Sequence, residues 1–570
     1  MKYRKYVKKY WYYFILGPLF LTLEAIGEFI LPFISSNIIN TGIANGNKEY
    51  IYQMGLIMVL IAIGMLITGV VGAYFAIHGA CYVARDIRSD AYKRVVEFSF
   101  TNIDDFTSAS LITRITNDVN QIEEFIQMML RGGFRSPVML IGAIVMSFML
   151  NSNVAIVIVG ALPILAFFIF LITMISLPRY RKMQEAIDDL NTNVKEVSTN
   201  SRVIKSFVRD DLEKEKFDNV NSNLCNKSVR ALKTMLWLEP ITTIILNATT
   251  ILVLYYGGIS VMQGNMNIGN LTAFITYLTQ ILNALNFLAN IVLKGTRAKA
   301  SSKRIKEIFN AKIDIVSKDN SIKVNNFDIE FKDVCYKYFK YNSNYVLKDI
   351  SFKINEGEKI GIIGQTGCGK STLISLIDRL YDTDSGNVLI GGVDIKDIDL
   401  EYLRLNISMV LQKNILFSGS IKDNLVWGKE DAKDEEILKA INISQASQFI
   451  NEMNGGLDYF IEEQGRNLSG GQKQRICIAR ALIKDPKILI LDDSLSAVDM
   501  ATERKILKGF KENLDKKTVL IIAQRISSIK DCDKILVLEN GMVKGFDSHK
   551  NLMTYCNEYK EIALSQNVGD

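Results

Sequence analysis

The sequence has no close pair of cysteines and no large excess of charge of either sign. Its seven cysteines are scattered, odd in number and free of CxxC spacing, which argues against a disulfide framework or a zinc site and indicates reduced thiols facing the cytosol. With 67 basic and 61 acidic residues, the net charge of +6 is too small to indicate a nucleic-acid partner. Hydrophobic residues at 48% and charged residues at 22% exclude a disordered chain or a coiled-coil rod, and suit an apolar part joined to a soluble part.

The first half of this 570-residue chain contains six long apolar stretches. They lie near residues 12–34, 54–77, 134–150, 154–177, 241–262 and 269–293. Each is long enough for a transmembrane helix, which needs about 20 residues. Only residues 151–153 separate the third stretch from the fourth, which predicts a tight helical hairpin. We therefore expect a membrane all-α domain of six transmembrane helices.

Basic residues are concentrated in alternate connections between these stretches. The connections 35–53, 151–153 and 263–268 contain a single one, Lys48, whereas 78–133 and 178–240 contain many. The positive-inside rule then places both termini and the two long loops in the cytoplasm, with the chain in the plasma membrane. Polar turns within these loops, at Asn102–Ser110 and around Asn200–Lys205, could dock on a soluble domain or be solvated turns.

The chain opens with alternating basic and aromatic residues, which predicts an amphipathic stretch at the inner face of the lipid bilayer. These residues are Lys2, Tyr3, Arg4, Lys5, Tyr6, Lys8, Lys9, Tyr10 and Trp11. A cleaved signal peptide fits poorly, because the apolar run that follows is long, contains two glutamates and ends without a cleavage site.

Two groups of polar residues lie inside the apolar stretches. Glu24 and Glu28 are four residues apart, on one helical face, where a carboxylate needs a cavity or a partner. The last stretch carries a polar stripe at helical spacing, made of Thr276, Thr279, Asn283, Asn286 and Asn290. Contact with a substrate or cation is one interpretation of these residues, and structural hydrogen bonds or helix packing are the other.

Beyond residue 323 short β-type runs alternate with helical ones, which predicts an α/β domain. The strand-like run 358–363 leads into a glycine-rich motif of the form GxxxxGK[ST] and then a helix. The motif and its first helical residue comprise Gly364, Gln365, Thr366, Gly367, Cys368, Gly369, Lys370, Ser371 and Thr372. Backbone N–H groups of such a loop surround phosphates, its lysine reaches the β and γ phosphates, and its serine ligates Mg²⁺. The predicted ligands are therefore ATP and Mg²⁺.

Two further segments belong with this loop. The apolar run 487–491 ends in Asp492, an acid suited to hold Mg²⁺ beside phosphates. A glycine-rich turn before a helix forms a second candidate anion site, with the sequence Leu468, Ser469, Gly470, Gly471 and Gln472.

Together, the phosphate loop, the LSGGQ segment, the acid strand and the preceding six spans resemble the ATP-binding cassette (ABC) exporters, as half-transporters with the membrane domain first. By that resemblance Tyr338 would stack on adenine, with Tyr336 as the neighbouring candidate, and Gln412 would join Ser371 and Asp492 around Mg²⁺. The resemblance also implies a dimer in which each ATP lies between one chain's phosphate loop and the other chain's LSGGQ. It suggests domains at 1–310 and 328–570, joined by a linker at 311–327.

Two positions depart from the family pattern. The family uses a glutamate after the magnesium aspartate, where this chain has Asp493, and a histidine after the next strand, where it has Gln524. The only two histidines, His78 and His549, lie elsewhere. A shorter carboxylate withdraws from the attacking water, and glutamine cannot act as an imidazolium.

The expected function is therefore one half of a heterodimeric exporter of amphipathic or drug-like compounds, similar to the degenerate-site subunits of bacterial multidrug exporters. This chain would hold ATP at a slow site and lend LSGGQ to a partner that carries the missing Glu and His. The alternatives are a homodimeric lipid or peptide exporter and a regulatory membrane protein that uses ATP only as a clamp.

Overall fold

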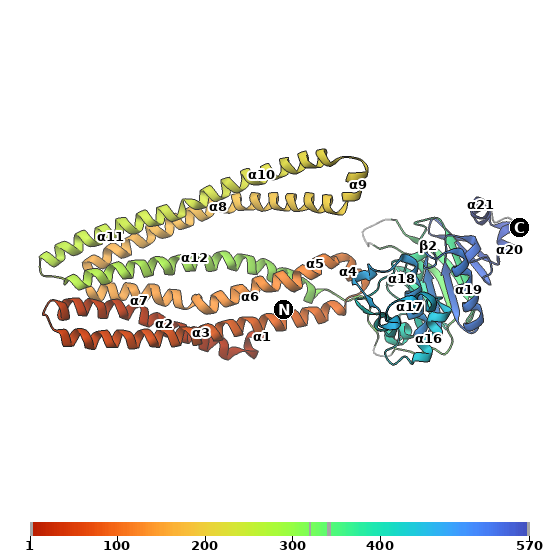
Figure 1. Ribbon diagram of the computed structural model, residues 1–570, viewed down its shortest axis with the longest axis horizontal. Coiled ribbons are helices and arrows are strands. Elements are labelled where there is room, and N and C mark those ends of the chain that lie inside the picture. The colour runs from red at the N-terminus through yellow and green to blue at the C-terminus, as the bar shows by residue number, and fades with distance from the viewer. Residues whose placement is uncertain (1–3, 319–320, 339–343, 567–570) are drawn as a thin grey trace. The chain divides into compact units, whose positions relative to one another are not determined.

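The computed structural model describes residues 4–318, 321–338 and 344–566. The chain forms two compact units, which we describe separately (Figure 1). Unit 1 comprises Met1–Val96 and Ser108–Ala311, and unit 2 comprises Glu97–Thr107 and Lys312–Asp570. Two parts of the sequence predictions lie outside the described residues, namely Lys2 and Tyr3 of the interfacial segment and positions 319–320 of the linker.

The described part of unit 1 is helical, and its six long runs confirm the six predicted apolar spans. The first three runs contain α1 (Arg4–Lys9), α2 (Trp11–Asn37), η1 (Ile38–Ile43), α3 (Lys48–Val96), α5 (Ser108–Thr113), η2 (Arg114–Asp118), α6 (Val119–Met128), η3 (Met129–Gly133) and α7 (Arg135–Leu150). The others contain α8 (Ser152–Thr199), α9 (Ser201–Ser206), α10 (Asp210–Leu236), α11 (Leu238–Met262) and α12 (Ile268–Asn310). Helices satisfy their backbone hydrogen bonds internally, as a bilayer requires.

The predicted hairpin between the third and fourth spans has a local cause. Asn151 adopts an extended conformation between α7 and α8, with φ −165°. Its side-chain oxygen accepts hydrogen bonds from the backbone N–H groups of Asn153 and Val154, at 3.0 and 3.2 Å. This N-cap starts α8 immediately after α7 ends, so the chain reverses within a few residues.

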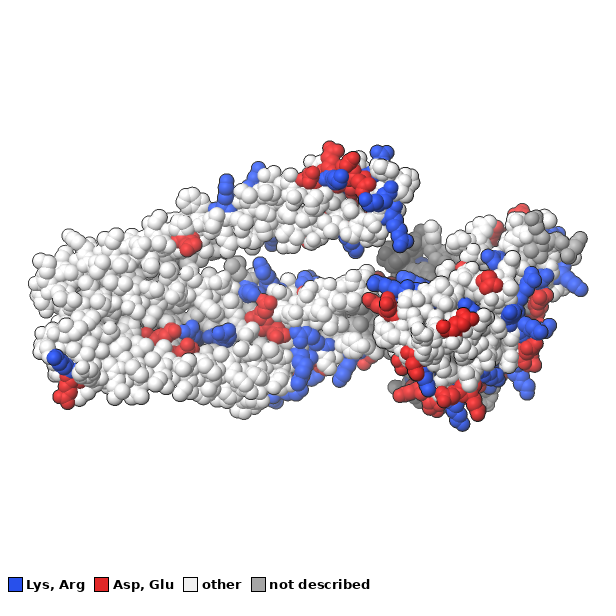
Figure 2. All heavy atoms as spheres, viewed as in Figure 1, with Lys and Arg blue, Asp and Glu red and all other residues white. Residues whose placement is uncertain are grey.

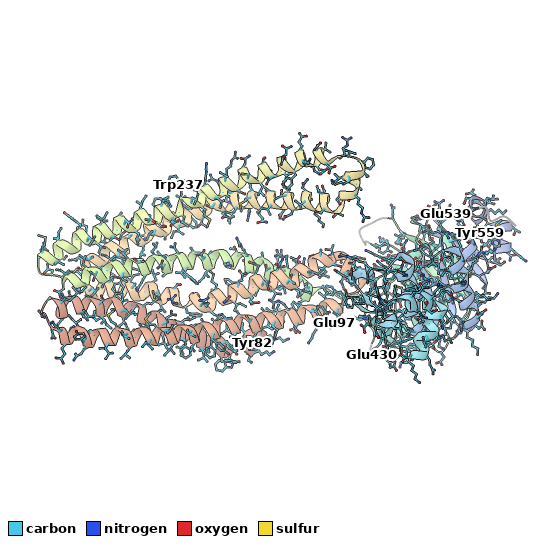
Figure 3. All side chains as sticks on the ribbon, in the orientation of Figure 1. Tyr82, Glu97, Trp237, Glu430, Glu539 and Tyr559 are labelled. Carbon is cyan, nitrogen blue, oxygen red and sulfur yellow. The ribbon has the colours of Figure 1, made fainter. Side chains whose placement is uncertain are left out.

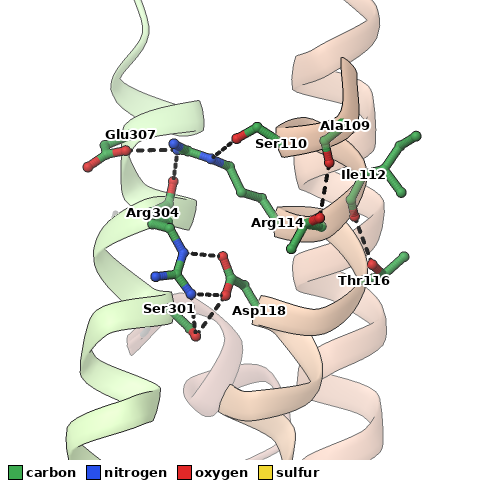
Figure 4. Close-up of polar contacts among 10 residues, drawn as sticks. Ala109, Ser110, Ile112, Arg114, Thr116, Asp118, Ser301, Arg304 and Glu307 are labelled. Carbon is green, nitrogen blue, oxygen red and sulfur yellow. Dashed lines mark hydrogen bonds and ion pairs between the residues drawn. The ribbon is translucent and has the colours of Figure 1, made fainter. Parts of the chain in front are cut away.

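Charged side chains are unevenly distributed over unit 1. On the face shown in Figure 2, the region near the α7–α8 hairpin is almost free of charge, whereas charged residues gather around α9 and around α1. One carboxylate among the long helices, Asp118 at the end of η2, is only 2% exposed. It accepts hydrogen bonds from Ser301 Oγ at 2.8 Å and Arg304 Nε at 2.7 Å (Figure 4). Because a buried charge needs such partners, this contact fixes α12 against η2.

The N-terminal helix α1 and the residue after it are attached to α3 by tyrosines. Tyr6 OH donates to Asp90 Oδ2 at 2.7 Å, and Tyr10 OH donates to Asp86 Oδ2 at 3.0 Å. The Tyr10 ring also lies 5.5 Å from the ring of Tyr82, which Figure 3 labels on α3. These contacts hold the predicted interfacial segment along the helix of the second span.

Unit 2 is an α/β domain, as predicted. Its strands are β1 (Ile329–Tyr336), β2 (Leu347–Ile354), β3 (Lys359–Gly364), β4 (Ser385–Ile390), β5 (Val393–Asp394), β6 (Ile407–Val410), β7 (Gly419–Ser420), β8 (Phe460–Ile461), β9 (Ile488–Asp492), β10 (Thr518–Ile522), β11 (Lys534–Glu539) and β12 (Met542–Asp547). Its helices are α4 (Phe100–Phe106), α13 (Lys370–Ile377), α14 (Leu400–Asn406), α15 (Ile421–Val426), α16 (Asp434–Ile443), α17 (Ser447–Glu452), η4 (Gly456–Asp458), η5 (Glu463–Gly465), α18 (Gly470–Ile483), α19 (Met500–Asn513), η6 (Ile526–Ser528), α20 (His549–Tyr555) and α21 (Asn557–Ser565).

The main sheet of unit 2 has the strand order β12-β11-β3-β10-β9-β6. Strands β11, β3, β10, β9 and β6 run parallel, and β12 is antiparallel to β11. Every residue of β9 and β10 is buried, as expected for central parallel strands covered on both faces. A second, antiparallel sheet has the order β2-β1-β4-β5.

The first predicted docking tip belongs partly to unit 2. Helix α4 begins after a capping box formed by Ser99 and Asn102. Tyr381 OH donates to Asp104 Oδ2 at 2.8 Å, and Asn102 Nδ2 donates to the Lys312 carbonyl at 3.1 Å. Residues 97–107, between the second and third spans, are therefore part of the α/β unit. Most of the second tip forms α9 in unit 1 and is largely exposed.

Candidate functional site

The predicted nucleotide-site residues follow four neighbouring parallel strands. The phosphate loop follows β3, Gln524 follows β10, Asp492 ends β9 and Gln412 follows β6, and these strands adjoin in that order. Parallel strands end at the same edge of a sheet, where ligands of open α/β sheets bind. The topology therefore brings together residues that are up to 160 positions apart in the sequence: 524 − 364 = 160.

The phosphate loop adopts a conformation that needs its glycines. Gly367 and Gly369 have φ of +84° and +102°, a region that disfavours residues with a Cβ. A Cβ on Gly364 would lie 2.1 Å from the Leu538 carbonyl oxygen. Lys370 Nζ donates to the carbonyls of Gly364 and Gln365, at 2.8 and 2.9 Å. This curled loop at the start of α13 fits an anionic phosphate chain.

The predicted magnesium ligands are oxygen groups beside this loop. Ser371 Oγ donates to Asp492 Oδ1 at 3.1 Å, and burial raises the pKa of the Asp492 carboxyl. Gln412 lines the same cavity. Among the described residues, no group of three His, Cys, Asp or Glu side chains could hold a metal ion. Hydroxyl, carboxylate and amide oxygens nevertheless suit Mg²⁺, which usually retains waters and takes further ligands from phosphates.

These residues line a cavity of about 530 Å³, within the usual range for small-molecule sites. Its lining consists of Tyr338, Val346, Ile363, Gly364, Gln365, Thr366, Gly367, Gly369, Lys370, Ser371, Thr372, Gln412, Asp492, Asp493, Ile522, Gln524, Ile562 and Gln566. Tyr338 OH lies 2.9 Å from Thr372 Oγ1, whereas Tyr336 is buried in the core. Cys368 also points into the core and does not line the cavity.

The two residues at the hydrolytic positions are bonded to each other. Gln524 Nε2 donates to Asp493 Oδ2 at 2.7 Å, and both line the cavity. Asp493 has φ +47°, in the left-handed region, and Ser496 Oγ donates to its carbonyl oxygen at 2.8 Å. One carboxylate oxygen of Asp493 is thus held by a carboxamide that cannot take up or release a proton.

The LSGGQ segment does not line this cavity. Ser469 caps α18, since its Oγ accepts from the Gln472 N–H at 3.3 Å and its own N–H donates to Gln472 Oε1 at 2.9 Å. Leu468 anchors the turn in the core, with 7% exposure, while Ser469 and Gly470 are exposed. The segment therefore presents a helix N-terminus at the surface, with Gly471 following.

Two adjacent cavities of about 830 and 600 Å³ lie among the helices of unit 1. Glu24 lines the larger and Glu28 the smaller, and Arg135 lines both. Arg135 is ion-paired with Glu28 and lies 3.7 Å from Glu24. The predicted carboxylates therefore share an intramembrane cation. Sequence reasoning missed Arg135, although Arg131 and Arg135 at the start of the third span have the same four-residue helical spacing as the glutamates.

The polar stripe on α12 is divided between different surroundings. Asn283 and Thr276 line the smaller cavity, whereas Asn286 and Asn290 line neither cavity. Thr279 donates to the Ile275 carbonyl of its own helix at 3.2 Å. Gln280, which was not singled out, donates to the Glu28 carbonyl at 2.7 Å. Of the five stripe residues, only Thr276 and Asn283 therefore line one of these two cavities.

Comparisons with known proteins find a matching family for a segment of each of the two units. Residues 14–285 match the family described as ABC transporter transmembrane region, and residues 347–496 match the family described as ABC transporter. The chain is 35% identical to the uncharacterized ABC transporter ATP-binding protein YfiB of Bacillus subtilis, over 96% of this chain and 95% of that protein. It is 33% identical to the putative multidrug export ATP-binding/permease protein YgaD of the same organism, over 87% and 86% of the two chains.

The fold is likewise similar to a solved one. A bacterial Atm1-family ABC exporter, determined with ATP bound, superposes with a TM-score of 0.82 over 99% of both chains, at 23% sequence identity.

Proposed function

Because this chain belongs to the ABC transporter family and is a half-transporter with fused membrane and ATPase domains, we propose that it forms one half of a heterodimeric exporter. Its membrane domain spans 1–310, a linker covers 311–327 and its ATPase domain covers 328–570. Within the pair, this chain holds the degenerate ATP site, and its partner holds the competent one.

The bond between Asp493 and Gln524 is the observation that carries this proposal. A general base must reach the attacking water, but Asp493 is one methylene shorter than glutamate and is engaged by Gln524. Gln524 can donate a hydrogen bond to a phosphate oxygen but carries no proton to exchange. Both replacements weaken hydrolysis while leaving the groups that bind the nucleotide in place.

The remaining residues have roles in nucleotide binding. Lys370 and the backbone N–H groups of the loop hold the phosphates, and Tyr338 stacks on adenine. Ser371, Gln412 and Asp492 hold Mg²⁺, which when bound neutralises phosphate charge and orients the terminal phosphoryl group. ATP retained here favours the closed dimer persistently, because a ligand shifts a conformational equilibrium by its differential affinity.

The exposed LSGGQ segment supports catalysis in a second chain. Ser469 and Gly470 lie at the surface, and no residue of the segment lines this chain's own ATP cavity, so the segment completes a site only when another ATPase domain faces it. In that partner, Glu and His occupy the positions of Asp493 and Gln524. Turnover then occurs mainly at the partner's phosphate loop.

The cargo that fits the membrane cavities is amphipathic or drug-like. Both cavities have mostly apolar linings, including Met65 and Phe287, with a few charged groups among them. The carboxylates of Glu24 and Glu28 are balanced in part by Arg135, so the site does not depend on a cationic cargo. A relative of this chain is described as a putative multidrug export protein. We place the transporter in the plasma membrane, with both termini and the ATPase domain cytoplasmic and no nucleic-acid partner.

Affinity purification of the tagged chain from its native membrane identifies the partner. We expect a second half-transporter to copurify, whereas a homodimer yields this chain alone. The ATPase rate of the purified pair is then measured with two variants. Asp493→Asn should retain most turnover, and Ser469→Ala should lose most of it, because Ser469 serves the partner's competent site.

Ser420→Ala is the matched control for Ser469→Ala. Ser420 caps α15 with the same reciprocal capping box but lies outside LSGGQ, so loss of a cap alone should affect both variants equally. A large loss of turnover in Asp493→Asn, or brisk hydrolysis by the chain alone, contradicts the proposal and favours the homodimer. Failure of ATP to drive uphill transport in sealed vesicles favours the regulatory clamp.

A further inference from the structure

A residue near the C-terminus holds the loop that carries Gln524. Gln566 follows α21, and its side chain contacts the segment after β10. Its Nε2 donates to the Gln524 carbonyl at 2.7 Å, and its Oε1 accepts from the Ile526 N–H at 2.8 Å. One carboxamide thus pairs with the backbone of two residues that are two positions apart, as a neighbouring strand would.

This contact is separate from the packing of α21 itself. Tyr559, which Figure 3 labels, is fully buried on α21, and Ala563 is also buried on that helix. Tyr559 OH further lies 2.8 Å from His549 Nδ1. These groups attach the helix to the domain, so the Gln566 side chain is not needed to do so. Its hydrogen bonds act on the loop instead.

The position of this loop determines what Gln524 can reach. One N–H of the Gln524 carboxamide donates to Asp493, and a primary amide has a second N–H. Both Gln524 and Gln566 line the nucleotide cavity. Without the two hydrogen bonds from Gln566, the Gln524 carbonyl and the Ile526 N–H lose their side-chain partners. The backbone at residues 524–526 is then less restrained, and so is the position of the second N–H of the Gln524 carboxamide.

We propose that Gln566 is a positioning residue of the nucleotide site, which holds Gln524 for contact with the terminal phosphate and so sets the preference for a triphosphate over a diphosphate. The inference rests on the proposed contact of Gln524 with that phosphate but not on the heterodimer. Both hydrogen bonds of the Gln566 side chain go to the loop backbone, and its effect on the nucleotide passes through Gln524.

The test measures binding of Mg-AMP-PNP and Mg-ADP to the purified full-length chain, by displacement of a fluorescent nucleotide. Gln566→Ala should weaken AMP-PNP binding relative to ADP by about tenfold, the lower end of the range for one hydrogen bond to a charged group. ADP affinity should remain unchanged. Ser565→Ala is the matched control, because Ser565 Oγ donates only within its own helix, to the Ile562 carbonyl at 2.8 Å.

A second variant, Gln566→Glu, separates a positioning role of residue 566 from a general loss of folding or stability. In Gln566→Glu the introduced carboxyl can donate to the Gln524 carbonyl only when protonated. The preference for AMP-PNP, measured relative to wild type at each pH, should therefore rise towards the wild-type value as the pH falls below the pKa of this carboxyl. Above that pKa it should fall to the value of Gln566→Ala. Facing a carbonyl oxygen raises the pKa of the carboxyl above its usual value of about 4.3. A merely structural role gives no such pH dependence.

Gln524→Ala distinguishes the proposed phosphate contact of Gln524 from the proposed positioning role of Gln566. If Gln524→Ala lowers the preference but Gln566→Ala does not, the positioning role is refuted while the phosphate contact stands. If neither variant changes the preference, the proposed contact of Gln524 fails as well. Equal losses of AMP-PNP and ADP affinity in Gln566→Ala also overturn the inference.

Discussion

Replacing Arg135 tests the charged group that the structure reveals inside the membrane domain. Arg135 is ion-paired with Glu28 and lies 3.7 Å from Glu24. At an effective dielectric constant of about 20, the attraction across 3.7 Å is about 4 kcal/mol before desolvation. The three side chains are 23–33% exposed, which lowers the net value. We expect Arg135→Gln to destabilise the folded chain by about 2–3 kcal/mol, because two neighbouring carboxylates lose their shared cation.

Glu28→Gln should cost less, about 1 kcal/mol, because Arg135 then keeps Glu24 as a partner. The double variant should be more stable than the sum of the two single changes predicts, by about 1–2 kcal/mol. The free energy of unfolding is measured by denaturant titration of the purified chain in mixed micelles. Arg131→Gln is the control, since Arg131 lines the same cavity and forms no ion pair with a described residue.

Additive effects of Arg135→Gln and Glu28→Gln would refute the reasoning, because groups that do not interact show no coupling energy. A stable Arg135→Gln variant with altered cargo affinity would instead assign the charged group to substrate contact. Stability and transport of a cationic dye are therefore measured on the same preparations.

Two further changes probe unit 2. Burial raises the pKa of Asp378 to about 6, opposed by Arg404 and Lys484, so the folded state binds this proton more tightly and loses stability as pH rises from about 4 to 6. Asp378→Asn should stabilise unit 2 by up to about 3 kcal/mol at pH 7.5 and leave its stability unchanged at pH 4. Calorimetry measures the stability, and equal changes in stability at both pH values would contradict this prediction. Gly428→Ala places a Cβ 2.2 Å from the Arg480 carbonyl oxygen and should lower the melting temperature through about 1–3 kcal/mol of overpacking; an unchanged melting temperature would show that the backbone yields freely.

Much of the fold could be predicted from local patterns. Six apolar stretches predict six spanning helices, because a bilayer leaves the backbone no other way to satisfy its hydrogen bonds. The hairpin at 151–153 follows from a single short polar interruption, and the cap by Asn151 supplies its mechanism. The nucleotide-site residues could likewise be recognised, since glycine-rich loops and strand-terminal acids have fixed spacing.

Pairs between distant residues could not be predicted in this way. The three nucleotide-site features of β3, β9 and β10 were each predicted separately, but strand order alone shows that they share one edge. The sequence indicated that Glu24 and Glu28 need partners, yet Arg135 is over 100 positions away, and a carboxylate attracts any cation within reach. Similarly, nothing in the spacing of residue 566 relates it to Gln524.

By itself, then, the sequence determined the spans, the α/β domain and the chemical types available at the nucleotide site, because hydropathy, periodicity and loop chemistry are properties of neighbouring residues. Only the tertiary structure decided which groups meet. Gln524 meets Asp493, Gln566 meets the loop that follows β10, and Arg135 meets two glutamates. Those contacts depend on how helices and strands pack, and packing is set by the whole chain at once.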